Sequence, residues 1–424
     1  MTAANRSSTI ASHLSSPQSV FAHVPQGKPD PILSLAAKYA ADPSPVKVNL
    51  GVGAYRDETG KPWVLPAVRR ADEQLLNDPS VNHEYLPVKG LESFNKAAAH
   101  LMFGSAAALQ EQRIVSHQTL SGTGANHLAA KFLARFYQFP AGRKAIYVCE
   151  PTWPNHYALF GEAGLEIEKY TYYDSKTLSL NLGGLLADLR AAPDGSVVLL
   201  HACAHNPSGV DPTPEQWREI ADLFRAKRHF AFFDAAYQGF VSGNPDHDAT
   251  AVRVFEAAGI PLLVCQSFAK NAGLYGERIG ALHVVTANQH EAAAVSSQLN
   301  VITRSEISMP PAYGARLVER ILNQPELRAE WDANIKTMSH RIIDMRRALF
   351  DLLTKKYHTP GSWEHIVTQN GMFSFLGISP EQCQRLEDEG HIYLVKSSRI
   401  SMAGLNPSNL EHVAQWIDRV VREA

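Results

Sequence analysis

The fold is decided by the stretch Pro261-Leu262-Leu263-Val264-Cys265-Gln266-Ser267-Phe268-Ala269-Lys270, an apolar run that leads to a lysine. A short apolar run of this kind predicts a strand buried in a sheet. A lysine at the end of such a strand loses water around its ammonium group, which lowers its pKa and makes the neutral amine available to attack a carbonyl carbon. Lys270 is therefore a candidate for forming a Schiff base.

Similar apolar runs occur on both sides of this stretch, separated by segments with helical periodicity. The runs cover residues 145–149, 197–203, 230–233, 262–265 and 281–285. Their alternation with helices predicts an α/β fold with a mostly parallel sheet and helices on both faces.

The chain is long enough for more than one domain. We expect residues 63–337 to form the large α/β domain. Residues 31–62 and 338–424, from the two ends of the chain, are expected to form a smaller α+β domain. Residues 1–30 are expected to form an N-terminal arm.

The overall composition favours small-molecule chemistry. The 424 residues include 40 Lys plus Arg and 42 Asp plus Glu, so the formal net charge of −2 gives no field that attracts nucleic acid or an anionic membrane. The four cysteines have no paired spacing, and no apolar run is long enough to span a membrane. A cytoplasmic location is expected, with the mitochondrial matrix as the alternative because the opening stretch is rich in serine and lacks acids.

Ligands of open α/β sheets bind beyond the carboxyl ends of the strands, so the residues that follow each apolar run are candidates for the site. These residues include Trp153, Asn206, Asp234, Tyr237 and Lys270. An acid can orient a cationic nitrogen, an aromatic side chain can stack on a flat ring, and an amide or phenol can bond a ring oxygen. Together with a nucleophilic lysine, these groups meet the needs of pyridoxal phosphate.

A phosphate cradle is predicted at Leu120-Ser121-Gly122-Thr123-Gly124, where small residues and hydroxyls open a helix, expected from about His127 to Tyr137, whose N-terminus attracts an anion. Ser267 and Arg278 lie near Lys270 in sequence and could complete the cradle. The segment lacks the spacing of a dinucleotide-binding fingerprint, which disfavours a dehydrogenase.

Each motif also has a simpler interpretation. Asp234 alone could cap a helix, and Trp153 alone could belong to the core or to an interface. His201, Cys203 and His205 alternate along a strand end as metal ligands can, but no fourth ligand is evident, so no metal is predicted.

Several further motifs stand in the same order as in one known family. They are Gly51-Val52-Gly53-Ala54-Tyr55-Arg56, Tyr85-Leu86-Pro87, Pro151-Thr152-Trp153, His201-Ala202-Cys203-Ala204-His205-Asn206-Pro207-Ser208-Gly209, Asp234-Ala235-Ala236-Tyr237-Gln238-Gly239-Phe240 and Ser398-Arg399-Ile400. With the cradle and the lysine segment, they make the chain resemble the aspartate aminotransferase family, the class I pyridoxal-phosphate enzymes of fold type I. The resemblance runs from about Phe21 to the C-terminus, and it implies a large domain with a seven-stranded type of sheet.

The resemblance implies a role for each cofactor-site residue. Lys270 forms the Schiff base, Asp234 pairs with the pyridinium nitrogen with His156 behind it, and Trp153 stacks on the ring. Asn206 and Tyr237 bond the phenolic oxygen. The phosphate is held by Ser121, Gly122, Thr123, Ser267 and Arg278, with Tyr85 from a second subunit. The implied catalytic residues are Lys270, Asp234, Tyr237 and Trp153.

For the substrate, the resemblance implies that Arg399 binds the α-carboxylate, helped by Gly53, Trp153 and Asn206, and that Arg304 reaches the distal carboxylate across a homodimer interface. The implied reaction of amino-acid metabolism transfers the amino group of L-aspartate to 2-oxoglutarate, giving oxaloacetate and L-glutamate by a ping-pong mechanism. The alternatives are an aromatic amino-acid transaminase of the same fold and a non-catalytic pyridoxal-phosphate-binding regulatory protein. Departures from the family pattern lie beside the two arginines, at Ser398, Glu306, Ile307 and Met309, and Glu306 offers an acid that competes for Arg304.

Overall fold

The computed structural model describes residues 19–27 and 29–423 of the chain. Its centre is a seven-stranded sheet in the order β2-β10-β9-β8-β7-β3-β4. β10 is antiparallel to both of its neighbours, and the other pairs are parallel, so the predicted fold class is confirmed. The strands are β2 (Ile114–Leu120), β3 (Ala145–Glu150), β4 (Glu166–Thr171), β7 (Val197–His201), β8 (Phe230–Ala235), β9 (Leu262–Ser267) and β10 (Ile279–Val285).

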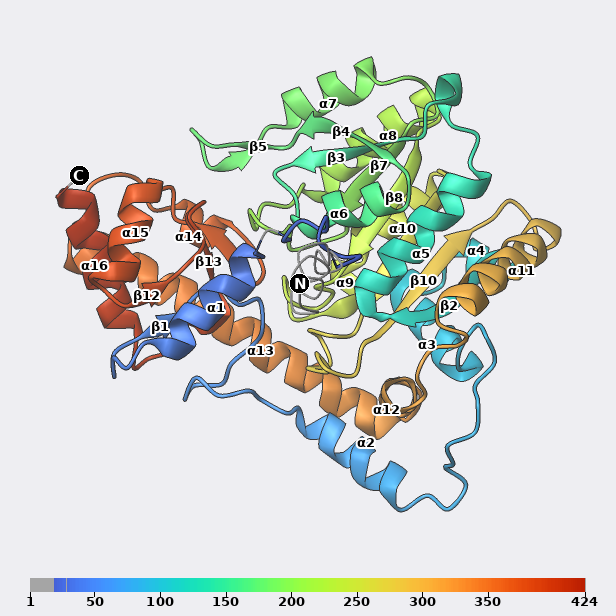
Figure 1. Ribbon diagram of the computed structural model, residues 1–424, viewed down its shortest axis with the longest axis horizontal. Helices are drawn as coiled ribbons and strands as arrows, with labels where there is room; N and C mark the ends of the chain where they lie inside the picture. The colour runs from blue at the N-terminus through green and yellow to red at the C-terminus, as the bar shows by residue number, and fades with distance from the viewer. Residues whose placement is uncertain (1–18, 28, 424) are drawn as a thin grey trace, which may run out of the picture.

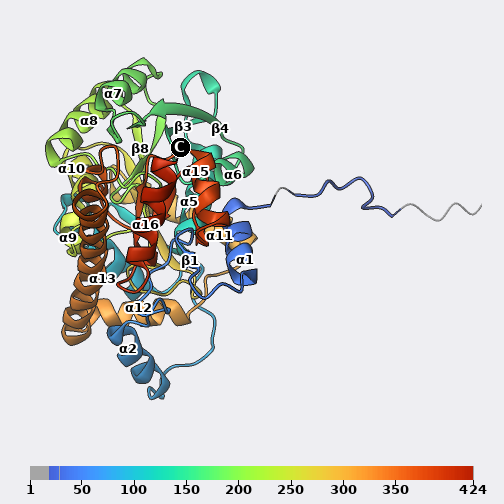
Figure 2. The same cartoon turned by 90° about the vertical axis from the view of Figure 1, so that its left-hand side faces the viewer.

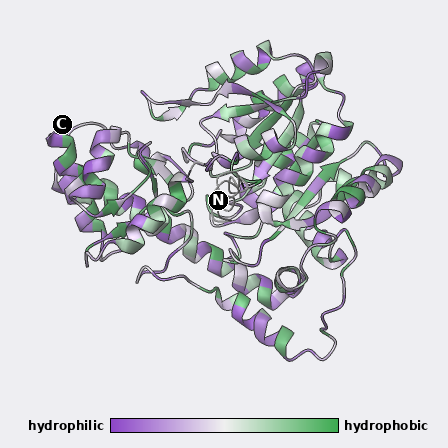
Figure 3. Ribbon diagram, in the orientation of Figure 1, coloured by the Kyte–Doolittle hydropathy of each residue, from purple (hydrophilic) through white to green (hydrophobic). Residues whose placement is uncertain are grey.

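Alternate side chains of the central strands enter two separate hydrophobic layers, as the two-residue period of a strand requires. In β8, for example, Phe233 packs in one layer and Phe232 in the other. Because both faces are covered, the strands read as continuous apolar runs, and Figure 3 shows their hydrophobic colour between the helices.

Helices from different parts of the chain cover each face (Figure 1). One layer contains side chains of α5 (Ser121–Phe136), α6 (Asn155–Glu162) and α11 (Gln289–Glu306). The other contains side chains of α3 (Glu92–Phe103), α7 (Leu182–Ala191), α8 (Pro214–Lys227) and α10 (Thr250–Ala257). The remaining elements of this part are α2 (Pro66–Leu76), α4 (Ala107–Gln110), α9 (Pro245–Asp248), α12 (Tyr313–Asn323) and the short hairpin of β5 (Tyr173–Asp174) and β6 (Ser179–Leu180).

The two ends of the chain meet in a second group of elements, seen at the left of Figure 1. β1 (Val48–Asn49) pairs in parallel with β12 (Ile392–Tyr393), and β11 (Phe373–Phe375) pairs antiparallel with β13 (Arg399–Ser401). The helices of this group are α1 (Pro31–Ala41), α14 (His365–Thr368), α15 (Pro380–Asp388) and α16 (Leu410–Arg422). The long helix α13 (Pro325–Asp351) joins the two groups and runs through residue 337, where the sequence places a domain boundary; the division into domains stays a prediction.

Residues 19–27 lead away from the rest of the chain in Figure 2, and the side chains of Val20, Phe21 and Val24 are exposed. The greater part of the predicted N-terminal arm, residues 1–18 and 28, lies outside the described residues. Within the described residues, none of the helices is both long and apolar enough to span a membrane.

Sequence patterns did not identify β2 and β4. In β2 the reason is that His117 and Gln118 are buried polar residues that interrupt the apolar run. Both are satisfied by partners from distant elements, because His117 Nε2 lies 3.1 Å from Asn300 Oδ1 and Gln118 Nε2 donates to the carbonyl of Pro311.

Candidate active site

A cavity of about 190 Å³ lies at the carboxyl ends of the central strands. Its lining combines residues at or just after the ends of β2, β3, β7, β8 and β9 with residues of the second group of elements. All the predicted site residues lie there except Tyr85 and Arg304. The predicted residues that line the cavity are Gly53, Ser121, Gly122, Thr123, Trp153, Asn206, Asp234, Tyr237, Ser267, Lys270, Arg278 and Arg399.

Lys270 enters the cavity from the loop that follows β9, as its position after the apolar run predicts. Burial lowers the pKa of its ammonium group; the Asp234 carboxylate opposes this shift, and the Arg278 charge adds to it. Lys270 Nζ lies 5.7 Å from the centre of the Tyr237 ring. The side chain is therefore a partly desolvated amine with aromatic and charged neighbours, which suits nucleophilic attack and proton transfer.

Asp234 is a residue of β8, not a helix cap. Its Oδ2 accepts hydrogen bonds from His156 Nε2 at 2.8 Å and from Asn126 Nδ2 at 3.4 Å. Burial alone raises the pKa of this carboxyl group, but the hydrogen bond and charge of His156 together with the Lys270 cation hold it below the ordinary value. Its Oδ1 is buried and has no hydrogen-bond partner among the described residues, so it can accept from a cationic N–H group of a ligand.

A chain of hydrogen bonds continues behind Asp234. Thr152 Oγ1 lies 2.9 Å from His156 Nδ1 and 3.0 Å from His201 Nε2, and the main-chain N–H of Asn206 donates to His201 Nδ1 at 3.4 Å. Burial and the charge of His156 lower the pKa of His201 to about 3, so His201 is neutral. The donated N–H fixes its tautomer, which makes Nε2 the donor to Thr152 Oγ1.

Sequence reasoning identified His156 but did not give Thr152 and His201 this role. The spacing of Thr152 and His156, four residues apart where α6 begins, is the one local signal of their contact.

The predicted phosphate cradle forms where α5 begins. The hydroxyl oxygen of Ser121, the first residue of α5, lies 3.0 Å from that of Ser267, the last residue of β9. A Cβ on Gly122 would lie 3.2 Å from Ser267 Cβ, so a larger residue cannot be placed there without movement. Free N–H groups at the helix N-terminus, two hydroxyls and the lining side chain of Arg278 could together hold a phosphate group. The helix starts earlier than predicted, at Ser121 instead of about His127.

Arg399 reaches the cavity from β13. It is buried, donates to the carbonyl of Gly51 at 2.6 Å, and lies 4.4 Å from the centre of the Phe373 ring. Its Nε is buried without a hydrogen-bond partner among the described residues, so the guanidinium keeps a donor for a carboxylate. Gly53 lies against the same ring, since a Cβ there would come within 2.7 Å of Phe373 Cζ.

Tyr85 and Arg304 are not brought into this cavity. Tyr85 is 79% exposed, and Arg304, in the last turn of α11, is an exposed residue that donates to the Ser308 hydroxyl. Glu306, which sequence reasoning treated as a competitor for Arg304, instead lies 3.0 Å from His127 Nε2 of α5.

The described residues that come together as possible metal ligands are Cys149, His201 and His205. This set differs from the one considered in the sequence, because Cys203 lines the cavity instead. The ring nitrogens of His205 already contact Ser208 Oγ at 2.8 Å and Cys149 Sγ at 3.3 Å, and those of His201 belong to the chain behind Asp234. Hydrogen bonds therefore explain why these three side chains lie together.

Comparison with known proteins gives matches over nearly the whole chain. The sequence matches the family described as aminotransferase class I and II over residues 45–417. The cytoplasmic aspartate aminotransferase of Schizosaccharomyces pombe is 49% identical, over 95% of this chain and 98% of that protein.

Solved structures agree with the sequence matches. The aspartate aminotransferase from Saccharomyces cerevisiae cytoplasm has a TM-score of 0.92 and 48% identity, covering 95% of this chain and 99% of that one. An aromatic-amino-acid aminotransferase from Burkholderia pseudomallei, covalently bound to pyridoxal phosphate, has a TM-score of 0.91 and 40% identity, covering 95% of this chain and 100% of that one.

Proposed function

The chain belongs to the aminotransferase class I and II family, and on this premise we propose that it transfers the amino group of L-aspartate to 2-oxoglutarate with pyridoxal 5'-phosphate as cofactor. The observation that carries the proposal is the meeting of Lys270, Asp234 and Arg399 in one cavity. These residues offer an amine for the cofactor aldehyde, a carboxylate for its ring nitrogen and a guanidinium for the substrate.

The cavity fits this cofactor in several independent ways. Asp234 Oδ1 and Asn206 Oδ1 are both buried without hydrogen-bond partners among the described residues, and unsatisfied buried oxygens of this kind are costly unless a ligand pairs with them. The pair of serine hydroxyls, Ser121 and Ser267, could bind the phosphate beside Gly122. When bound, pyridoxal phosphate supplies an aldehyde and an electron-withdrawing ring that stabilises negative charge at the substrate α-carbon.

The protein side chains divide the remaining work. Arg399 binds the α-carboxylate, and Lys270 takes the proton from the α-carbon, because burial favours its neutral amine. Asp234, kept ionised by His156, would keep a proton on the ring nitrogen of the bound cofactor. Asn206 and Tyr237 would hold its phenolic oxygen, and Trp153 would stack on its ring. Release of the oxo acid before the second substrate binds gives ping-pong kinetics.

We also propose a homodimer in which Tyr85 reaches the partner's phosphate site and Arg304 binds the distal carboxylate in the partner's cavity. In support, both residues lie outside the cavity of their own chain, and the Tyr85 side chain is exposed. Mixing Lys270→Ala with Arg304→Ala protein then leaves one intact site in each mixed dimer, so about a quarter of the activity should return at an equal ratio. No recovery after subunit exchange would contradict shared sites.

Steady-state kinetics test the substrate assignment. Initial rates with aspartate and 2-oxoglutarate should give parallel double-reciprocal lines, and Lys270→Ala should bind the cofactor with almost no turnover. Arg304→Ala should raise the KM for aspartate about 30-fold or more, since it unpairs a buried carboxylate, and leave phenylalanine nearly unaffected. A preference of the unaltered protein for phenylalanine would favour an aromatic transaminase, which the Burkholderia relative exemplifies. Absence of any turnover would favour a regulatory protein.

Relatives at nearly equal identity include proteins named cytoplasmic and proteins named mitochondrial. We propose the cytoplasm for this chain, with the mitochondrial matrix as the alternative; the dispersed cysteines fit a reducing compartment, which both are. Fractionation of cells that carry the full-length chain distinguishes the two compartments.

A further inference from the structure

Arg346 is a buried cation in α13 whose side-chain hydrogen bonds all go to main-chain carbonyls. Its Nη1 donates to Ile366 at 2.9 Å, and its Nη2 donates to Asn370 at 3.2 Å, to Gly371 at 2.9 Å and to Phe373 at 2.5 Å. None of the ion pairs among the described residues includes Arg346. Burial lowers the pKa of its guanidinium to about 9, with the nearby charge of Asp211 opposing the shift.

A buried charge without a bonded carboxylate is costly, so the hydrogen bonds must fix something that a neutral side chain cannot. The planar guanidinium carries five N–H donors in a rigid fork, and here it holds carbonyls along one segment, residues 366–373, which turns from α14 into the first residue of β11. We call this segment the clamped turn.

The clamped turn leads directly into the strand that supports Arg399. Phe373 begins β11, which pairs with β13 so that Phe375 lies opposite Arg399 and Phe373 opposite Ser401. The Phe373 ring lies 4.4 Å from the Arg399 guanidinium and 5.9 Å, edge to face, from the Tyr237 ring. Any shift of the clamped turn therefore moves the surface on which the guanidinium rests.

The same turn also contacts the loop that carries Asn206. The N–H of Asn370 donates to the carbonyl of Gly209 at 2.5 Å. Gly371 lies against Ala204, with so little room that an added Cβ would come within 2.4 Å of Ala204 Cβ. The clamped turn thus lies between the loop of Asn206, on the cofactor side, and the strand of Arg399, on the substrate side.

We propose that Arg346 is a positioning residue for the substrate α-carboxylate, because the turn that it clamps sets the place of Arg399 relative to Asn206 and Tyr237. This inference rests on the proposed function for the role of Arg399. It predicts that loosening the clamp weakens amino-acid and oxo-acid binding while the cofactor stays bound, because Lys270, Asp234 and the phosphate cradle lie at the ends of β9, β8 and β2, outside the clamped turn.

The test is Arg346→Lys in the holoenzyme, which keeps the positive charge but replaces the fork with one ammonium group. The KM values for aspartate and for 2-oxoglutarate should both rise about tenfold, equivalent to one weakened charge-assisted hydrogen bond, while kcat changes less than about threefold. The KM for phenylalanine should rise by the same factor, since it carries the same α-carboxylate. The amount of bound cofactor, measured by its visible absorption before substrate is added, should be unchanged.

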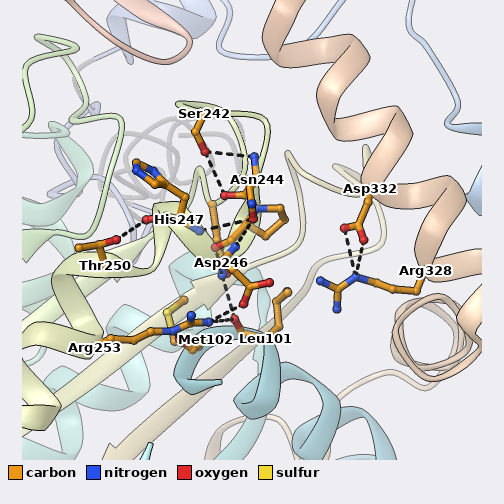
Figure 4. Close-up of polar contacts among 12 residues, drawn as sticks. Leu101, Met102, Ser242, Asn244, Asp246, His247, Thr250, Arg253, Arg328 and Asp332 are labelled. Carbon is orange, nitrogen blue, oxygen red and sulfur yellow. Dashed lines mark hydrogen bonds and ion pairs between the residues drawn. The ribbon is translucent and has the colours of Figure 1, made fainter. Parts of the chain in front are cut away.

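Arg253→Lys is the matched control (Figure 4). Arg253 also holds main-chain carbonyls, donating to Met102 at 3.0 Å and to Leu101 at 3.2 Å, and it pairs with Asp246 at 2.7 Å. None of these residues lines the cavity. The Arg253 variant should leave all three KM values unchanged, and equal KM rises in the two variants would overturn the proposal.

Other outcomes also decide the question. Unchanged KM values in the Arg346 variant, or loss of cofactor in parallel with the rise in KM, would overturn a positioning role. If that variant does not fold, Gly371→Ala moves the same turn with Arg346 in place; it should raise both KM values, and unchanged values refute the inference. Arg399→Lys separates the two proposals, because unchanged KM values in that variant would refute the role of Arg399 itself.

Discussion

Gly371→Ala should be among the more damaging single-methyl substitutions in this protein. Gly371 has φ of +70°, a left-handed conformation that costs a residue with a Cβ about 1–2 kcal/mol. The new Cβ would also lie 2.4 Å from Ala204 Cβ and 3.2 Å from Ala204 Cα, so the turn or the loop must move. Overpacking of this kind typically costs about 1–3 kcal/mol more. The expected loss in the free energy of unfolding is therefore about 2–5 kcal/mol.

Gly259→Ala isolates the first of these two contributions. Gly259 has nearly the same φ, +69°, where the chain leaves α10, but a Cβ there meets nothing within 4 Å. This substitution should cost only the left-handed strain, about 1–2 kcal/mol. The difference between the two variants measures the contact between the clamped turn and Ala204.

Urea unfolding of both holoenzymes, followed by tryptophan fluorescence at one cofactor concentration, gives the comparison. Gly371→Ala should unfold at a clearly lower urea concentration than Gly259→Ala, and only the former should raise the KM for aspartate. Equal midpoints would show that the turn does not pack tightly on the loop of Asn206, and the reasoning about this junction would then be wrong.

Three further predictions follow from single side chains. In the cofactor-free protein, the lowered pKa of Lys270 means that the folded state binds fewer protons than the unfolded state. The free energy of unfolding, measured by urea titration relative to Lys270→Met, should therefore rise from pH 7 toward pH 10. A difference between the two proteins that does not change with pH would contradict the lowered pKa. Ser398→Gly removes the strain of a left-handed residue at φ +64°, but it also removes the hydrogen bond that the Ser398 hydroxyl accepts from the Gly377 N–H. The two effects oppose each other, so the free energy of unfolding should change by less than about 1 kcal/mol. A larger loss would mean that the hydrogen bond outweighs the strain. Glu306→Gln should keep the KM for aspartate within about twofold of that of the unaltered protein, because Glu306 contacts His127 and not Arg304. A marked fall in this KM would show that Glu306 competes with the substrate for Arg304.

Local patterns were sufficient for much of the site. Apolar runs placed β3, β7, β8, β9 and β10, since burial on both faces leaves a continuous apolar signal in the sequence. The polar residues after those runs line one cavity because the carboxyl ends of parallel strands meet at one edge of the sheet.

Patterns failed where a polar group is satisfied by a distant partner. β2 was missed because its buried His117 and Gln118 resemble surface residues until Asn300 and the Pro311 carbonyl are seen beside them. Glu306 resembled a competitor for Arg304 until the structure placed His127 of α5 next to it.

The sequence alone therefore determined the kind of chemistry, through a lysine, an acid and a phosphate cradle at the ends of recognisable elements. The tertiary structure decided which distant segments complete the site. Only packing brings Arg399 and Lys270 into one cavity, extends the Asp234 contacts through Thr152 to His201, and makes a buried Arg346 hold the turn between substrate and cofactor sides. Hydrophobic periodicity is a local property of the chain, whereas these contacts depend on the non-local docking of the two ends of the chain against the central sheet.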